Sequence, residues 1–280
     1  MSSGTQIQSA NAPINPLFRW AGSKRKVLPE LASYWSNHYR RYIEPFAGSA
    51  ALFFRIAPNK AVLNDINGGL IQAYEVIRDR PDDVHRRVSR ITRSEKQYYT
   101  MRDKEPTSLS ALDQAVRFVY LNRLCFNGIF RTNMAGEFNV PYAHSRAGSI
   151  PSVEDFRRCA SLLANASLKS GDFGSILSAA RKGDFVYLDP PYAVESRRVF
   201  RQYDKRAFTT KDLERLGGHL DALNRKGVDF VISYADCREA RNIFSSWNTR
   251  RIRVRRNIAG FTASRRIAIE LLATNIASER

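Results

Sequence analysis

The chain has 280 residues, a hydrophobic content of 43% and a formal net charge of +18 at pH 7. That length suits one large α/β domain, with or without an inserted lobe, and the apolar content excludes wholesale disorder. The charge favours a polyanionic partner, most simply nucleic acid, over a membrane, because no apolar run of about 18 residues occurs.

The cysteines and histidines exclude other classes. Three cysteines stand far apart without CxxC spacing, at Cys125, Cys159 and Cys237. Their odd number and separation suit a reducing cytoplasm. The four histidines are scattered and show no metal-ligand spacing, so we predict no metal site.

The first part of the chain is typical of a doubly wound α/β sheet. Residues 1–15 are polar, lack the basic start and apolar core of a signal peptide, and are expected to form a flexible lead-in. A helix is predicted over 26–39 and a strand over 41–46. A second helix follows the Ala47-Gly48-Ser49 turn, and a second strand is predicted over 61–66. This order predicts a mostly parallel, Rossmann-like sheet.

The middle of the chain differs from its two ends. Helical patterns are predicted at 70–79, 82–91, 94–102 and 112–125, before a turn-rich segment at 127–149. Strand patterns return at 184–188, 228–234, 250–255 and 267–273, with helices between them at 210–226 and 237–244. We therefore expect one α/β domain built from residues 16–68 and 169–280, with a mostly helical lobe inserted at 69–168.

The strand at 184–188 ends in Asp189-Pro190-Pro191-Tyr192, at the edge where open α/β sheets bind their ligands. Each proline sets its own φ at about −65°, and Pro191 keeps Pro190 extended, so the carbonyls beside Asp189 point in a set direction. A carboxylate and a pre-aimed carbonyl form an acceptor pair for an exocyclic amino group, with Tyr192 placed to stack on the attached ring. The alternative is a strand that ends in a proline-rich turn.

Two further motifs favour a nucleoside ligand. Gly48 permits a tight turn before a helix, and Asp65 follows it by 17 positions, like the carboxylate that holds ribose hydroxyls in α/β folds. An uncharged nucleoside cofactor fits this loop better than a dinucleotide, and a plain strand–helix turn is the alternative. Trp20 and Lys24 flank a small-residue turn that could close over a ligand, or could only staple the indole to the core.

Segment 121–142 predicts a hairpin with turns at Asn127-Gly128 and Ala135-Gly136. Its side chains suited to base edges are Asn127, Arg131, Thr132 and Asn133. The alternative is a hairpin that braces the helical lobe. Arginines that follow the proline motif, including Arg197 and Arg198, are interpreted as a loop that holds DNA phosphates or closes over an extruded base. For the arginines at 250–256, DNA contact and a solvated face both stay open.

Five segments occur in an order that resembles the Dam-type DNA adenine-N6 methyltransferases of the D12 class, alpha group. They are RWAGSK at 19–24, EPFAGSAALFF at 44–54, LNDIN at 63–67, LNRLCFNGIFRTNMAGEFNVPY at 121–142 and YLDPPY at 187–192. The resemblance covers nearly the whole chain. It implies site-specific transfer of a methyl group from S-adenosylmethionine to N6 of a flipped-out adenine in double-stranded DNA, without a metal. Ala50 departs from the family pattern, since many relatives carry a second glycine there.

The resemblance also implies residue roles. Catalysis would fall to Asp189, Pro190 and Tyr192. The implied cofactor contacts are Trp20, Lys24, Phe46, Gly48, Asp65, Asp172, Phe173 and Asp189. Lys24 would lie near the methionine carboxylate, Asp65 would take the ribose hydroxyls, and Asp172 and Phe173 would contact the adenine ring. The DNA contacts are Arg19, Asn127 and Arg131 by resemblance, with Asn133, Arg197 and Arg198 added from the residue patterns.

On this interpretation residues 16–68 and 169–280 form the cofactor-binding catalytic domain, and 69–168 form the DNA target-recognition domain. The enzyme would work in the cytoplasm, as a bacterial or phage-encoded type, alone or beside a restriction endonuclease that acts on the same site. One alternative is methylation of cytosine N4 or of a protein glutamine amide, although those enzymes usually carry Ser or Asn at the position of Asp189. Another is a catalytically inactive DNA-binding regulator on a methyltransferase scaffold.

Overall fold

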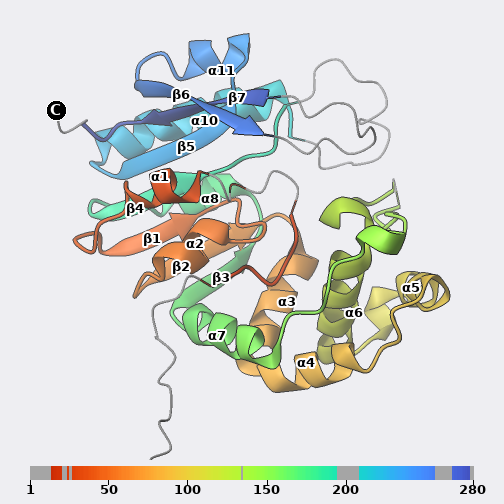
Figure 1. Cartoon of the computed structure of the whole chain (residues 1–280). Helices are drawn as coiled ribbons and strands as arrows, with labels where there is room; N and C mark the ends of the chain where they lie inside the picture. Colours follow the sequence, from red (N-terminus) through yellow and green to blue (C-terminus); the bar gives the residue numbers. More distant parts are fainter. Residues whose placement is uncertain are drawn as a thin grey trace, which may run out of the picture.

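The structure is a computed structural model of the chain and describes residues 14–20, 24, 27–133, 135–193, 208–255 and 267–277. The described residues form a seven-stranded sheet with helices on both faces (Figure 1). The strands are β1 (Arg41–Glu44), β2 (Ala61–Asp65), β3 (Ala166–Ser170), β4 (Asp184–Leu188), β5 (Asp229–Ala235), β6 (Asn248–Arg255) and β7 (Ile267–Thr274). The helices are α1 (Leu28–Ala32), α2 (Ala51–Ile56), α3 (Gly68–Asp79), α4 (Pro81–Ser89), α5 (Glu95–Arg102), α6 (Ala111–Leu124), α7 (Val153–Leu163), α8 (Phe173–Ser178), α10 (Thr210–Arg225) and α11 (Arg238–Ile243).

The strand order is β3-β2-β1-β4-β5-β7-β6. Strands β1 to β5 pair in parallel, whereas β7 runs antiparallel between β5 and β6. From β1 the chain builds outward through β2 to β3, and it then returns to place β4 on the other side of β1. The order therefore reverses between β1 and β4, and the carboxyl ends of these two strands meet where such sheets bind ligands.

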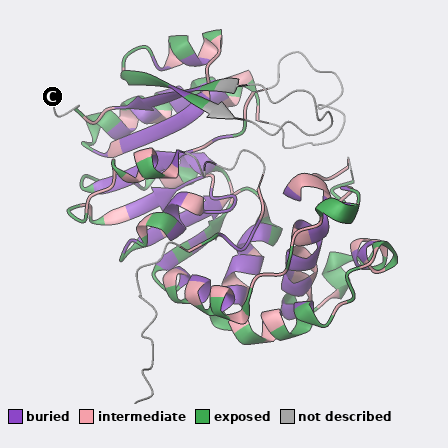
Figure 2. Ribbon diagram, in the orientation of Figure 1, coloured by how far each residue is buried: buried purple, intermediate pink, exposed green. Residues whose placement is uncertain are grey.

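The alternation of buried side chains separates two cores. In β4, Phe185 and Tyr187 pack into one core, and Val186 and Leu188 pack into the other. Residues of α1, α2, α3, α6 and α7 share the first core, and residues of α8, α10 and α11 share the second. Both faces of β4 are thus covered, which explains its continuous apolar sequence. Figure 2 shows the buried central strands between these helices.

Helices α3 to α7 gather at one side of the sheet, beyond β3 (Figure 1). The ends of several of these helices are set by local sequence. Ser152 begins α7 with a capping box, in which Ser152 Oγ accepts the Asp155 N–H and the Asp155 carboxylate accepts the Ser152 N–H. At the start of α5 the Ser94 side chain accepts one backbone N–H, and at the start of α6 the Ser110 side chain does the same. No helix in the described ranges is long and apolar enough to cross a membrane.

Most elements confirm the sequence expectations, and the differences have local causes. The helix predicted over 26–39 is too long: among the described residues it reduces to α1, because the Tyr34 and Trp35 N–H groups bond to carbonyls three residues back and the chain continues in turns. Helices α7 and α8 and strand β3 were not anticipated as separate elements. The expected domain boundary at 168/169 falls inside β3.

The expected β-hairpin of segment 121–142 is not a regular one. Among the described residues it forms only two isolated antiparallel bridges, Cys125–Tyr142 and Thr132–Phe138. The reversal around Thr132 is held by Asn133 N–H to the Glu137 carbonyl at 2.9 Å and by Asn139 N–H to the Arg131 carbonyl at 3.1 Å. The ladder stays short because the Asn133 side chain takes turn N–H donors and glycines interrupt the flanking residues.

Candidate active site

A cavity of about 1470 Å³ opens at the carboxyl ends of β1, β2 and β4. All the residues predicted to bind the cofactor or to catalyse line this cavity: Trp20, Lys24, Phe46, Gly48, Asp65, Asp172, Phe173, Asp189, Pro190 and Tyr192. Asn133 also lines it, so one predicted DNA contact faces the same space. The tertiary structure therefore brings together motifs that lie up to 172 positions apart, from Trp20 to Tyr192.

Asp189 follows β4 directly and has one oxygen held by the protein. Its Oδ1 lies 3.1 Å from Lys24 Nζ and accepts the Ser233 hydroxyl at 3.2 Å. Oδ2 contacts no donor among the described residues. Burial raises the pKa of Asp189, and the adjacent Lys24 opposes that rise. The cation therefore favours the ionised carboxylate, which is an acceptor.

Lys24 is 5% exposed and lies among three oxygen atoms. Its Nζ is 2.9 Å from Glu270 Oε2, 3.1 Å from Asp189 Oδ1 and 3.3 Å from the Tyr192 hydroxyl. Burial alone would lower the pKa of Lys24, but Asp189, Tyr192 and Glu270 together hold it above its usual value. An ammonium has three N–H donors, so these three acceptors match its capacity. A contact of Lys24 with the cofactor carboxylate stays a prediction.

The turn after β1 is built around Gly48, whose φ of +47° favours glycine. A Cβ at this position would lie 2.7 Å from Cδ1 of the Trp20 indole, so the ring packs directly on the turn. Ala50, the departure from the family pattern, also has a positive φ, at 49°. An alanine in that conformation costs about 1 kcal/mol more than a glycine, which makes this turn mildly strained.

Asp65 ends β2 and closes the same turn. Its Oδ2 accepts the Gly48 N–H at 2.9 Å, and its Oδ1 accepts the Asn67 N–H at 2.9 Å. Burial raises the pKa of Asp65 although both N–H groups oppose the rise. Each oxygen keeps further acceptor capacity, so the carboxylate suits a hydroxyl pair presented from the cavity.

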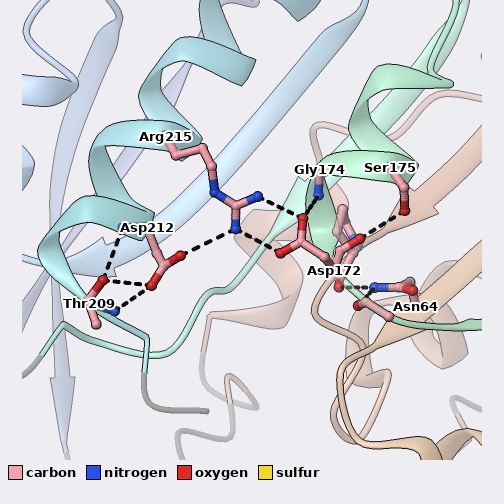
Figure 3. Close-up of polar contacts among 9 residues, drawn as sticks. Asn64, Asp172, Gly174, Ser175, Thr209, Asp212 and Arg215 are labelled. Atoms are coloured by element: carbon pink, nitrogen blue, oxygen red, sulfur yellow. Dashed lines mark hydrogen bonds and ion pairs between the residues drawn. The ribbon is translucent and has the colours of Figure 1, made fainter. Parts of the chain in front are cut away.

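Asp172 is the N-cap of α8, and Phe173 is the first residue of that helix. Arg215 of α10 holds Asp172 (Figure 3) and also covers the Phe173 ring. The guanidinium forms a bidentate pair with Asp172, at 2.7 Å to each oxygen, and its Cζ lies 4.1 Å from the Phe173 ring centroid. Asp172 Oδ1 also accepts the Gly174 N–H at 2.8 Å. The Arg215 side chain holds the pKa of Asp172 below its usual value. Arg215 therefore braces this wall from α10, and it lines the cavity together with Asp172 and Phe173.

The predicted DNA contact Arg19 is clamped to α6. Asn122 accepts the Arg19 N–H at 2.8 Å and donates to the Arg19 carbonyl at 2.8 Å. The Arg19 side chain lies against Gly128, where a Cβ would come within 2.3 Å of the Arg19 Cβ. Gly128 is thus required for the close approach of these two segments.

The other predicted DNA contacts make contacts within the protein. Arg131 Nε donates to Asn139 Oδ1 at 2.8 Å, and Asn133 Nδ2 donates to Glu137 Oε2 at 2.8 Å. Asn127 has a positive φ of 55° next to Gly128. Arg197 and Arg198 lie outside the described residues. Contact of any of these side chains with DNA stays a prediction.

Sequence reasoning missed three supporting residues. Ser233 on β5 and Glu270 on β7 complete the surroundings of Asp189 and Lys24, and Arg215 braces Asp172. For Glu270 a signal existed, because it is the one charged residue within the apolar run 267–273. Ser233 and Arg215 had none, since their partners lie more than 40 positions away in the chain.

This mostly parallel seven-stranded sheet, with its cavity at the switch point between β1 and β4, is consistent with a methyltransferase fold. The chain belongs to the D12 class of N6 adenine-specific DNA methyltransferases, whose family profile matches residues 20–258. The protein is an adenine-specific DNA methyltransferase. Among the described residues, no group of three or more His, Cys, Asp or Glu side chains is arranged to hold a metal ion.

Relatives from three bacteria span nearly the whole chain. The type II methyltransferase M1.LlaDCHI of Lactococcus lactis subsp. cremoris is 33% identical over 278 residues, which are 96% of this chain and 98% of the relative. The DNA adenine methylase of Escherichia coli K12 is 28% identical over 260 residues, 91% of this chain and 93% of the relative. The DNA adenine methylase of Serratia marcescens is 30% identical over 261 residues, 91% of this chain and 96% of the relative.

Proposed function

We propose that this methyltransferase moves a methyl group from S-adenosylmethionine to N6 of an adenine that is extruded from double-stranded DNA into the cavity. The observation that carries the proposal is the placement of Asp189, with one oxygen held by Lys24 and Ser233, in the same cavity as the Gly48–Asp65 turn. The acceptor for an amino group and the candidate nucleoside site thus share one space.

The residues present fit S-adenosylmethionine. Because Gly48 has no Cβ, the Trp20 indole packs directly on the turn and gives the cavity an aromatic wall, and Asp65 offers a carboxylate beside that turn. Carboxylates of Asp65 and Asp189 line the cavity, which suits a donor with sulfonium and ammonium charges. When bound, S-adenosylmethionine supplies an electrophilic methyl group on its sulfonium sulfur.

The cavity size supports simultaneous binding of the donor and a base. Its volume of about 1470 Å³ exceeds the roughly 300–1,000 Å³ that suffices for one small molecule. An extruded adenine would enter beside Tyr192, which lies on the cavity wall. The Tyr192 ring packs edge-on against the Tyr234 ring, with 5.2 Å between the ring centroids. Extrusion costs a few kcal/mol, and stacking within the cavity would offset part of that cost.

The protein's contribution to the reaction is orientation of the adenine amino group. The N6 lone pair is delocalised into the ring, so the free amine is a weak nucleophile. The two N–H groups of the amine would donate hydrogen bonds to Asp189 and to the Pro190 carbonyl, which would draw the nitrogen toward tetrahedral geometry. The lone pair would then point at the methyl carbon. Formation of the nitrogen–carbon bond would break the carbon–sulfur bond, the sulfur would leave as a neutral thioether, and the methylated nitrogen would lose one proton. Orientation of this kind lowers the barrier without a covalent enzyme intermediate.

The direct test is single-molecule sequencing of DNA from a methylation-deficient bacterial host that expresses the chain. N6-methyladenine in one recurrent sequence context is the expected result, and it also identifies the recognition site. Unmodified adenine in DNA from a host that contains folded protein would contradict the proposed substrate.

Arg131→Ala is expected to relax sequence selection at one base pair, because an arginine that contacts guanine supplies about 1–3 kcal/mol of discrimination. The structure places Arg131 in the short reversal whose neighbour Asn133 lines the cavity. Methylation rates on recognition sites with single base changes measure the effect. Arg55→Ala, at an exposed position of α2, removes the same charge and should keep full selectivity.

Arg215→Ala is expected to raise the dissociation constant for S-adenosylmethionine about tenfold, which corresponds to about 1.4 kcal/mol. Arg215 braces Asp172 and covers Phe173, the proposed adenine-ring contacts of the cofactor. Calorimetry without DNA measures this constant. Arg225→Ala, an exposed position at the other end of α10, is the matched control and should bind normally. Equal affinity in both variants would contradict the role given to Arg215.

We further propose that the enzyme acts in the cytoplasm, either alone or as the protective partner of a restriction endonuclease. The type II name of the Lactococcus lactis relative supports the second arrangement. The separated cysteines Cys125, Cys159 and Cys237 are all free thiols, which suits a reducing compartment.

A further inference from the structure

Glu270 is a buried carboxylate whose two oxygens contact Lys24 and Tyr192 in the active-site region. It is 2% exposed on β7, between apolar neighbours on both sides. Its Oε2 lies 2.9 Å from Lys24 Nζ, and its Oε1 accepts the Tyr192 hydroxyl at 3.0 Å. One carboxylate therefore joins a residue near the start of the chain to the last residue of the Asp189–Tyr192 motif.

The antiparallel direction of β7 places Glu270 at this edge of the sheet. Because β7 runs opposite to β5, its early residues lie beside the carboxyl end of β5, and Glu270 pairs with Ala235. Glu270 is not among the residues that line the cavity, whereas Lys24 and Tyr192 are. It therefore lies behind these two side chains and acts on the cavity only through them.

Burial of this charge is costly unless it is paired. A carboxylate in an apolar strand loses several kcal/mol of solvation, and only well-placed donors compensate for the loss. Lys24 and Tyr192 provide those donors, and Lys24 in turn lies 3.1 Å from Asp189. The four groups form a connected network in which the positions of Lys24 and Tyr192 depend on Glu270.

We propose that Glu270 is a positioning residue for methyl transfer, which holds Lys24 against Asp189 and holds the Tyr192 ring in place through its hydroxyl. The proposal rests on the role given above to Asp189 as the acceptor for the adenine amino group. Removal of the Glu270 charge would weaken the hydrogen bond that its carboxylate accepts from the Tyr192 hydroxyl, and it would leave one carboxylate instead of two beside Lys24. The adenine would then still bind, but in a less productive orientation.

The test measures methyl transfer and binding separately in Glu270→Gln, Tyr192→Phe and the double variant. Glu270→Gln keeps the side-chain shape, and the single-turnover rate is expected to fall about 10–100-fold, as for a small misplacement of a reacting group. Dissociation constants for S-adenosylmethionine and DNA are expected to stay within about twofold, because only the reactive geometry changes. The double variant should lose no more than the more impaired single variant, since the two residues act as a unit.

Asp184→Asn is the matched control, because Asp184 is also buried and ion-paired but lies at the first residue of β4, away from this edge. It should lower stability and leave the single-turnover rate of the folded protein unchanged.

A Glu270→Gln rate within about twofold of wild type, or full additivity with Tyr192→Phe, would overturn the proposal. Tyr192→Phe removes one of the two contacts without a charge change, so it tests the same link if Glu270→Gln folds poorly. Asp189→Ala is measured alongside: if it keeps activity, the role of Asp189 fails; if it is inactive and Glu270→Gln is normal, only the role of Glu270 fails.

Discussion

Asp189→Ala is expected to reduce the rate of methyl transfer by about 10³-fold, within the range that a single positioned proton acceptor contributes. The variant removes the oxygen that would accept the adenine amino N–H, and it leaves Lys24 without the partner at 3.1 Å. DNA affinity should change little, since the proposed DNA contacts lie on other segments of the chain.

Transfer of a labelled methyl group in a single turnover measures the rate, and a fluorescence titration with a duplex that holds the recognition site measures binding. Arg131→Ala is the comparison variant: it should alter the selection of the DNA sequence and keep the rate of methyl transfer. An equal loss of DNA binding in both variants would contradict this division of roles between catalysis and recognition.

Asp184→Asn is expected to lower the free energy of unfolding by about 3 kcal/mol, the scale for one partner removed from a buried ion pair. Asp184 is fully buried at the start of β4, where it accepts from Arg41 Nη2 at 2.6 Å and from the Arg181 N–H at 2.9 Å. These contacts hold β4 to β1 at the end of the sheet opposite the cavity. The amide that replaces the carboxylate leaves Arg41 without its buried countercharge.

Urea denaturation measures this loss, and thermal unfolding should show a midpoint lower by roughly 6–12 °C. Asp221→Asn removes the same charge from an exposed position of α10 and should stay within about 0.5 kcal/mol of wild type. An Asp184→Asn variant as stable as the Asp221→Asn control would show that the ion pair between β1 and β4 contributes little.

Most of the fold was predictable because its signals are local. The apolar run 184–188 and the proline motif after it correctly indicated β4, whose carboxyl end opens on the cavity, and helices α3 to α6 matched their periodic patterns closely. β3 was missed because its sequence, Ala-Ser-Leu-Lys-Ser, is mostly polar, and it is a strand only because it pairs with β2 along its full length. The prediction of a regular hairpin at 121–142 was wrong for a related reason. Local turn signals reverse the chain, but they do not by themselves produce a ladder of hydrogen bonds between two strands.

The sequence by itself determined the chemistry-bearing motifs and the type of sheet, because φ restriction, turn residues and hydrophobic period act over a few neighbouring residues. It therefore indicated Asp189 as the reacting acceptor and the Gly48–Asp65 turn as a nucleoside site. Only the tertiary structure decided which side chains complete that site. Lys24 meets Glu270 across 246 positions because β7 runs antiparallel beside β5, and Arg215 meets Asp172 because α10 packs on α8. Pairings of this kind depend on strand order and helix packing, which no local pattern in the chain encodes.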